Sequence, residues 1–285
     1  MKIRISADST ADLSQELLEK FNIPTMPLHV SLGEKDCLDG VTIQPQDIYD
    51  FYATAKKLPK TGARSAEEYK EFFQKILDEG YDAIVHFTIS SDMSASFSNA
   101  ELASRDFKDV YVVDSRQLST GIGLLVLDAC DMVEAGLTAK EIADRAVART
   151  EATKSSFIVN TLEFLYKGGR CSALAYLGAN LLQIKPCLEV KNGLIGVESK
   201  PMGRYRRCVD KYCESIKAKM TNPDPKRCFV THTQMDEGIA EEVIETVKSW
   251  GIFDEVLETV AGCTVTTHCG ANTIGILFIN DGGLK

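Results

Sequence analysis

The stretch Thr161-Leu-Glu-Phe-Leu-Tyr-Lys-Gly-Gly-Arg170 marks the point where the pattern of the chain changes. It has the spacing of a short amphipathic helix that runs into Gly168-Gly169, a pair that permits backbone conformations closed to other residues. Residues 173–182, which follow soon after, read Ala-Leu-Ala-Tyr-Leu-Gly-Ala-Asn-Leu-Leu and are apolar on nearly every side. A helix of this kind is buried in a core or packs against an apolar ligand.

The chain before this stretch alternates short β-rich runs with helical patterns, which is typical of a parallel sheet with helices on both faces. Two sequences, Ser65-Ala-Glu-Glu68 and Thr138-Ala-Lys-Glu141, have the spacing of capping boxes and predict the starts of helices. We expect strands at residues 3–7, 23–30, 83–89 and 110–113, and helices near residues 14–21, 45–55, 66–79, 94–107 and 123–134.

The chain after this stretch predicts a different architecture. Residues 187–190 and 194–197 flank Lys191-Asn192-Gly193, a strong signal for an antiparallel hairpin, which does not belong in a doubly wound sheet. We therefore expect a two-domain α/β fold: a parallel-sheet α/β/α domain over residues 1–155 and a mixed-sheet α/β domain over residues 156–285. Further strands are expected at residues 157–160, 228–231, 255–259 and 273–279, and helices at 204–220 and around 240–247.

Composition and charge narrow the classes of function. The chain has 285 residues and a formal net charge of −9, which argues against binding to nucleic acid or to anionic membranes, since both depend on excess lysine and arginine. Its longest apolar runs fall far short of the ~20 residues that span a bilayer, so we expect no stable membrane insertion. Nine cysteines at scattered spacings predict reduced thiols in a cytoplasmic protein, and nothing in the sequence demands more than a monomer.

Several Ser/Thr-rich segments follow predicted strands, where ligands of open α/β sheets bind. Hydroxyls and backbone N–H groups at helix N-termini form anion sites, although any one such segment is more typical of helix capping. His268 is the histidine best placed for function, because we expect it in a small-residue loop between two strands, with its ring in a cleft. The Ser/Thr-rich segments are residues 8–12, 61–65, 89–96, 114–115 and 119–123.

Metal, cofactor and hydrolase chemistry have less support. No paired C-x-x-C spacing accompanies Cys263, His268 and Cys269, so no metal site is expected, and no glycine-rich phosphate loop predicts a nucleotide cofactor. Ser94, His268 and Asp114 supply the residue types of a hydrolase, but the chain has no G-x-S-x-G motif. A hydrolase that acts on an acyl substrate through Ser94 and His268 therefore remains an alternative.

A basic cluster stands out in this acidic chain: Lys200, Arg204, Arg206, Arg207 and Lys211. On a helix, Arg204, Arg207 and Lys211 share one face. Two interpretations stay open, a solvated helix face or a docking surface for an acidic or phosphate-bearing partner.

Taken together, these segments resemble the DegV family, which includes the FakB-type fatty-acid-binding subunits of bacterial fatty acid kinase. The resemblance covers essentially the whole chain, and the Lys-Gly-Gly-Arg segment is its most specific part. It is carried by Asp8-Ser-Thr-Ala-Asp-Leu13, Ile89-Ser-Ser-Asp-Met-Ser94, Val113-Asp-Ser115, the stretch from Thr161 to Arg170, Lys185-Pro186 and the His268 segment.

The resemblance implies a two-domain α/β fold with a long-chain fatty acid buried between the domains. It assigns the carboxyl group of that fatty acid to Thr61, Ser94 and His268, with Ser65 and Ser96 in the supporting loops. It also implies a non-catalytic subunit without a cofactor. Such a subunit presents the carboxyl group to a separate kinase, and the acyl phosphate formed there feeds phospholipid synthesis.

Two further sets of residues follow from the apolar segment and the basic cluster. Small residues leave room for an acyl chain, so we expect Ala175 and Gly178, together with Leu182, to line its tunnel. Arg204 falls where the family carries a basic residue associated with partner docking and product phosphate, and Arg207 lies on the same helix face.

Three loops depart from the residues that are usual in the family. The family's Thr-Ser-x-Pro-Ser is here Thr61-Gly-Ala-Arg-Ser65, its Ser-Gly-Thr is Ser94-Ala-Ser96, and its His-x-Gly-Pro-Gly is His268-Cys-Gly-Ala-Asn272. Hydroxyls are kept at positions 61, 65, 94 and 96, so the resemblance still implies an intact carboxyl anchor. Gly62 and Arg64 change its surroundings.

Overall fold

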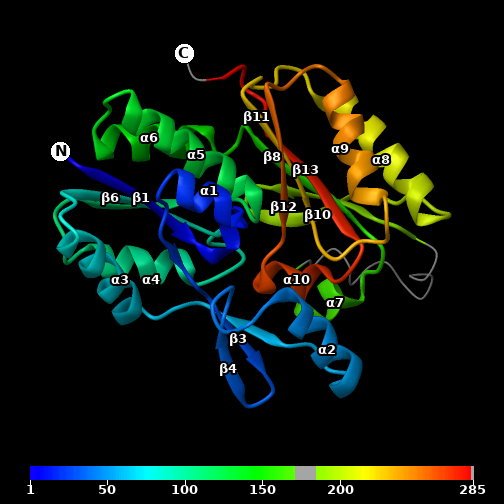
Figure 1. The fold of residues 1–285 in the computed structure, drawn as a ribbon, viewed down its shortest axis with the longest axis horizontal. Coiled ribbons are helices and arrows are strands. Elements are labelled where there is room, and N and C mark those ends of the chain that lie inside the picture. The colour runs from blue at the N-terminus through cyan, green and yellow to red at the C-terminus, as the bar shows by residue number, and fades with distance from the viewer. Residues whose placement is uncertain (171–183, 284–285) are drawn as a thin grey trace.

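The computed structural model describes residues 1–170 and 184–283. Figure 1 shows them folded around two larger sheets, with helix α5 (Thr120–Glu134) between. One side of α5 contacts strands of the first sheet, and the other side contacts the middle strands of the second. The predicted tunnel residues Ala175, Gly178 and Leu182 lie outside the described residues.

The four-stranded sheet is parallel throughout, in the order β2-β1-β6-β7. Alternate residues of β6 face opposite ways: Val85 and Phe87 join the core with α5 and α6, whereas Ile84 packs with α3 and α4. The expected parallel sheet with helices on both faces is therefore confirmed. The elements are β1 (Ile3–Asp8), β2 (Thr25–Met26), β6 (Ala83–Thr88) and β7 (Val110–Asp114), with η1 (Ser9–Ala11), α1 (Gln15–Lys20), α3 (Ala66–Asp78), α4 (Ser96–Ser104) and α6 (Ala139–Arg149).

The two predicted capping boxes are confirmed. The hydroxyl of Ser65 accepts a hydrogen bond from the backbone N–H of Glu68 at the start of α3, and Glu68 accepts one from the N–H of Ser65. Thr138 and Glu141 form the same reciprocal pair at the start of α6. Both pairs satisfy backbone donors that the first turn of a helix leaves unpaired.

The six-stranded sheet is mixed, in the order β10-β9-β8-β13-β11-β12, and it carries the predicted hairpin β9–β10. Helices α8 and α9 bury their apolar faces against one side of it. Strand β8 starts at Thr153, and the domain boundary at residue 155 stays an interpretation of the sequence. The elements are β8 (Thr153–Val159), α7 (Glu163–Gly168), β9 (Cys187–Lys191), β10 (Leu194–Ser199), α8 (Tyr205–Lys219), β11 (Arg227–His232), α9 (Ile239–Ser249), β12 (Glu255–Val260), α10 (Cys263–Cys269) and β13 (Thr273–Ile279).

The structure also contains a small third sheet that the sequence does not predict. It has three antiparallel strands in the order β4-β3-β5, namely β3 (His29–Leu32), β4 (Lys35–Leu38) and β5 (Lys60–Gly62), and α2 (Pro45–Ala55) lies beside it. The single strand expected at residues 23–30 is two strands, β2 and β3. They belong to different sheets, because Pro24 and Pro27 cannot donate to a ladder and interrupt the run.

Arg149, at the end of α6, connects the part of the chain around the four-stranded sheet to the part around the six-stranded sheet. Its guanidinium is buried and forms ion pairs with Asp128 of α5, with Asp224 at 2.7 Å and with Asp281 at 2.8 Å. Asp224 and Asp281 flank the six-stranded sheet, one before β11 and the other after β13. Without Arg149, Asp128 would keep only its longer ion pair with Arg227, at 3.7 Å, and Asp224 and Asp281 would lose the arginine that they share.

We predict that Arg149→Leu lowers the free energy of unfolding by about 3–5 kcal/mol, because three carboxylates lose their buried partner. Urea unfolding followed by circular dichroism measures this change. Arg145→Leu is the matched control, since Arg145 is exposed on the same helix, and it should change stability by about 0.5 kcal/mol or less. Similar small losses in both variants would contradict the role given to Arg149.

Candidate functional site

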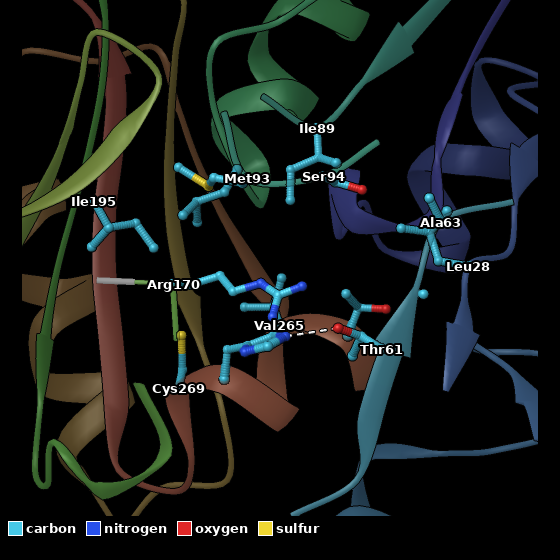
Figure 2. A pocket seen from close by; sticks show the side chains of 14 residues that line it. Leu28, Thr61, Ala63, Ile89, Met93, Ser94, Arg170, Ile195, Val265 and Cys269 are labelled. Carbon is cyan, nitrogen blue, oxygen red and sulfur yellow. Dashed lines mark hydrogen bonds between the residues drawn. The ribbon is translucent and has the colours of Figure 1, made fainter. Parts of the chain in front are cut away.

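A cavity of about 580 Å³, counted with the open space at its mouth, lies where segments distant in sequence meet. Its walls are mostly apolar, and its polar side chains are few (Figure 2). The lining residues are Leu28, Thr61, Gly62, Ala63, Ile89, Met93, Ser94, Leu118, Arg170, Ile195, Thr264, Val265, His268 and Cys269.

Thr61, Ser94 and His268, which the resemblance assigns to one site, all line this cavity. Thr61 lies on β5, and its Oγ1 is 2.8 Å from Nε2 of His268, the pair joined by the dashed line in Figure 2. Ser94 lies in the turn between β6 and α4, where its backbone N–H donates to the carbonyl of Ser90. Figure 2 places Thr61 and Ser94 on the same side of the cavity, opposite Ile195.

His268 lies on the short helix α10, not in the loop that the sequence predicted. The side-chain oxygens of Asp39 accept hydrogen bonds from the backbone N–H groups of Cys263 at 2.7 Å and Thr264 at 3.1 Å. A carboxylate at this end satisfies unpaired donors and favours the helix dipole. The helix is therefore stabilised by a residue more than two hundred positions away, which the local sequence does not reveal.

The Asp8–Asp12 segment holds backbone in place and does not line the cavity. Asp12 accepts hydrogen bonds from the backbone N–H of Gly262 at 2.9 Å and from the hydroxyl of Ser119 at 2.6 Å. Asp8 accepts one from the backbone N–H of Ile89, at the end of β6, at 3.2 Å. These contacts connect the first strand to the two segments that carry Ser94 and His268.

The Gly-Gly pair has a clear structural reason. A Cβ atom on Gly168 would lie 2.3 Å from Nδ1 of His268, so only glycine allows the ring its position. Gly169 has φ +67° and ends α7 in the left-handed conformation that glycine favours. At the other end of the contact, a Cβ atom on Gly270 would lie 2.7 Å from the ring of Phe164 on α7. Helices α7 and α10 therefore meet through glycines.

The His268 ring, at the polar end of the cavity, carries no charge at neutral pH. Burial lowers the pKa of His268 to about 4, and the charge of Arg170 acts in the same direction. The ring is therefore neutral at pH 7, with one donor and one acceptor nitrogen. Its Nε2 pairs with Thr61, while Nδ1 is buried and has no hydrogen-bond partner among the described residues.

Arg170, the last residue of the Lys-Gly-Gly-Arg segment, also lines the cavity, although the sequence predicts no place in the site for it. It follows α7 directly, and its Nη1 donates a hydrogen bond to the carbonyl of Gly168 at 2.8 Å. In Figure 2 its side chain extends into the cavity from the end of that helix. The signal in the sequence was its place after two glycines, which predicts a turn but not the direction of the side chain.

Of the two supporting serines, Ser96 lies beside the site and Ser65 lies farther along its loop. Ser96 is buried, and its hydroxyl is 3.0 Å from the hydroxyl of Ser94. Ser65 is exposed and caps α3, and it does not line the cavity.

Ser94, His268 and Asp114 are the residue types of a hydrolase, but they are not hydrogen-bonded to one another as in a catalytic triad. Asp114 accepts hydrogen bonds from the backbone N–H groups of Ser91 and Arg116 at 3.1 Å and 3.0 Å. Ser94 pairs with Ser96, and His268 pairs with Thr61. In a catalytic triad, by contrast, the histidine bonds both the nucleophile and a carboxylate.

The basic cluster lies at the start of α8. Arg204 immediately precedes the helix, and Arg204, Arg207 and Lys211 are all exposed. Arg206 is engaged elsewhere: it forms an ion pair with Glu242 of α9 and donates to the carbonyl of Glu237 at 3.1 Å. Arg204, Arg207 and Lys211 are thus all exposed near the start of α8, but Arg204 lies before the helix, so only Arg207 and Lys211 share a helix face.

The positions that depart from the family's usual residues fall in and around the site. Gly62 lines the cavity on β5, and Arg64 forms an ion pair with Glu68 at 2.8 Å. Ala95 is exposed, next to Ser94. Asn272 has φ +54°, a conformation that asparagine tolerates, and its side chain pairs with Asp236.

Residues 1–170 and 184–283 hold neither a metal site nor a membrane-spanning helix. None of the His, Cys, Asp and Glu side chains there are grouped as a metal site would need. No helix in the same ranges has the length and hydrophobicity required to cross a membrane.

Comparison with known proteins finds relatives over nearly the whole length of the chain. A family model described as "Uncharacterised protein, DegV family" matches residues 2–281. A curated protein of Thermotoga maritima named "Fatty acid-binding protein" is 31% identical over 281 residues, which cover 96% of each chain.

Two solved structures share the fold. A fatty-acid-binding DegV family protein from Thermus thermophilus has a TM-score of 0.90 and 28% identity, over 98% of this chain and 100% of that one. The fatty acid binding protein DegV from Bacillus subtilis has a TM-score of 0.86 and 25% identity, over 99% of this chain and 100% of that one. The two-domain α/β architecture of these relatives is the one described above, and this chain belongs to the DegV family.

Proposed function

We propose that this protein binds a long-chain fatty acid and presents its carboxyl group to a separate kinase. On this proposal it is a cytoplasmic, non-catalytic subunit, and the acyl phosphate formed with the kinase feeds phospholipid synthesis. The observation that carries the proposal is one apolar cavity with Thr61, Ser94 and His268 gathered at its polar end. Similar proteins from Thermotoga maritima and Thermus thermophilus are described as fatty-acid-binding, which supports it.

The energetics of the cavity favour a ligand with a long apolar part. Each buried methylene contributes roughly 0.8 kcal/mol, so a chain of ~16 carbons contributes on the order of 12 kcal/mol before the loss of its freedom. An ionised carboxylate removed from water costs several kcal/mol unless it is hydrogen-bonded. The hydroxyls of Thr61 and Ser94 are placed to make those bonds, while the apolar walls supply affinity.

A second cavity gives the acyl chain a direction to follow. It has a volume of about 340 Å³, counted with the open space around it. Its lining comes from the turn before α5, from α10 and from strands β8, β11 and β13 of the six-stranded sheet. Leu118, Val265 and Cys269 line both cavities, so the two lie next to each other. We propose that the chain runs from the polar end past these three side chains, with Ala175, Gly178 and Leu182 as further candidates to line it.

The exposed basic surface fits the second half of the proposal. Arg204 and Arg207 stand at the start of α8, where a kinase with an acidic or phosphate-bearing surface could dock. The net charge of the whole chain is −9, so this local positive patch contrasts with its surroundings.

The experiment that tests fatty-acid binding is mass spectrometry of the purified protein, under native and then denaturing conditions. We expect a retained mass that matches a fatty acid and is released on denaturation. A protein that is empty and that also fails to take up added palmitic acid would refute the proposal. Release of the free acid from an added acyl ester, with turnover, would favour the hydrolase alternative.

We predict that Gly168→Ala weakens binding of palmitic acid roughly tenfold or more, because the added Cβ displaces His268 and leaves Thr61 without its partner. Isothermal titration calorimetry measures the dissociation constant. Gly196→Ala is the control, since a Cβ atom there has no neighbour closer than 4.0 Å. Unchanged affinity in Gly168→Ala would show that the position of His268 does not matter for the head group.

We predict that Arg207→Glu lowers kcat/KM for phosphorylation of bound palmitic acid roughly tenfold, because it reverses a charge on the docking surface. The assay uses the kinase subunit of a bacterial fatty acid kinase with ATP. The dissociation constant for palmitic acid should stay the same, since Arg207 does not line the cavity. Lys140→Glu, on the exposed face of α6, is the control, and an equal loss in both variants would argue against a specific docking role.

A further inference from the structure

We propose that Ser119 is a positioning residue for the fatty-acid site. Its backbone is held in a strained conformation, and its hydroxyl holds Asp12 against the start of α10, the helix that carries His268. The inference rests on the proposed function, because the ring of His268 belongs to the head-group site. It adds a residue that acts on the ligand through Asp12 and α10 and does not itself line the first cavity.

The backbone of Ser119 is strained. It lies directly before α5, with φ +52° and ψ −144°, a combination that glycine adopts readily and that other residues avoid. The residue is only 4% exposed, and its carbonyl accepts a hydrogen bond from the N–H of Ile122 at 2.9 Å in the first turn of α5. Glycine at this position would form the same turn without strain. A serine is kept in such a turn when the contacts of its side chain offset the strain.

The hydroxyl of Ser119 makes that contribution through two buried hydrogen bonds in series. Its Oγ donates to Oδ2 of Asp12 at 2.6 Å, and Oδ1 of the same carboxyl group accepts from the backbone N–H of Gly262 at 2.9 Å. Gly262 is the residue before α10, and a Cβ atom there would lie 3.0 Å from Oδ1 of Asp12. The carboxyl group is therefore packed directly against the start of the helix, and Ser119 fixes the direction in which it faces.

The second carboxyl group at the start of α10 does not replace this pair. Asp39 accepts from the N–H groups of Cys263 and Thr264, the first residues of the helix. Asp12 holds the residue before them, and in the part of the chain that the structure describes its Oδ2 has no hydrogen-bond partner besides Ser119. Without that hydroxyl, a buried carboxyl oxygen would lack a donor, which costs more than the loss of one exposed bond. The carboxyl group would then turn, and the start of α10 would move with it.

A displacement at the start of α10 reaches His268, because the helix has only seven residues and His268 lies in its last turn. The ring pairs with Thr61 at 2.8 Å, and Thr61 lies on the separate three-stranded sheet. Hydrogen bonds weaken steeply when their distance and angle depart from the preferred values. A small shift of the helix therefore weakens the pairing at the polar end of the cavity while the fold stays intact.

The test separates the hydroxyl from the backbone strain. Ser119→Ala removes the hydroxyl and keeps the strain, whereas Ser119→Gly removes both. We expect both variants to bind palmitic acid roughly three- to tenfold more weakly than the wild-type protein in isothermal titration calorimetry. We expect the unfolding temperature of Ser119→Gly to be roughly 2–6 °C higher than that of Ser119→Ala, because glycine relieves the strain. Affinity then follows the hydroxyl, and stability follows the backbone.

Variants of Asp12 and a matched control complete the test. Asp12→Asn keeps an oxygen for the N–H of Gly262 and offers Ser119 an amide group to pair with, so it should bind palmitic acid nearly as well as the wild type. Asp12→Ala should bind about as weakly as Ser119→Ala, and both changes together should cost no more than either alone. The control is Ser6→Ala, which removes another buried serine hydroxyl, paired with His86 at 2.9 Å on the four-stranded sheet, and should leave the affinity unchanged.

The outcomes distinguish this inference from the proposed function. If the wild-type protein does not bind palmitic acid, the proposed function fails and the inference fails with it. If the wild type binds but both Ser119 variants bind equally well, Ser119 has no positioning role and the binding function stands. The same conclusion follows if affinity changes in step with the unfolding temperature, if Ser6→Ala loses as much affinity, or if Asp12→Asn binds as weakly as Asp12→Ala. Equal losses in both Ser119 variants, with near-normal binding in Asp12→Asn, support the inference.

Discussion

The site depends on two buried carboxyl groups, Asp12 and Asp39, which hold helix α10 against the N-terminal part of the chain. Asp39 pairs with the first N–H groups of the helix, and Asp12 with the N–H of Gly262 just before it. Burial raises the pKa of Asp12 to about 8, although its hydrogen bonds with Ser119 and Gly262 act in the opposite direction. These bonds hold α10 in a position where His268 contacts Thr61, which lies on β5 of the three-stranded sheet.

Close packing then limits which residues can surround the ring. His268 touches Gly168 on one side, and α10 ends at Gly270, which lies against Phe164 of α7. Helix α7 is further tied to α2, where the hydroxyl of Tyr52 donates to Glu163 at 2.5 Å. The Lys-Gly-Gly-Arg segment is the most specific sign of the family in the sequence. Its Gly168 packs against His268, and the carbonyl of Gly168 accepts the hydrogen bond from Arg170.

Much of the fold could be predicted because its signals are local. Strand β13 has the bounds expected at residues 273–279, and the hairpin at Asn192-Gly193 follows from the residues of its turn. Helix α10 could not be predicted, since Cys-Thr-Val-Thr-Thr-His-Cys is poor in helix-forming residues and Asp39 stabilises it from far away in the sequence. The three-stranded sheet could not be predicted either, because its strands are very short.

The site itself was only partly predictable, because a side chain's direction is set by tertiary contacts. The resemblance groups Thr61, Ser94 and His268, and all three line the cavity. Most of the other hydroxyls and carboxylates near strand ends have a structural use: Ser65 caps a helix, and Asp12 and Ser119 pair with each other. Arg170 went unrecognised because a residue after two glycines can point in many directions.

The electrostatics of the polar end suit binding better than catalysis on an ester. A histidine with a pKa of about 4 is a weak base at neutral pH, and a general base works best when its pKa lies near the working pH. In the proposed function, by contrast, the ligand's own carboxylate oxygen must attack ATP, so the protein has to hold that carboxylate without protonating it. A neutral ring and hydroxyls can orient the head group, and a nearby arginine favours its ionised form. The features that make His268 a poor catalytic base are therefore the ones a carrier of an ionised carboxylate requires.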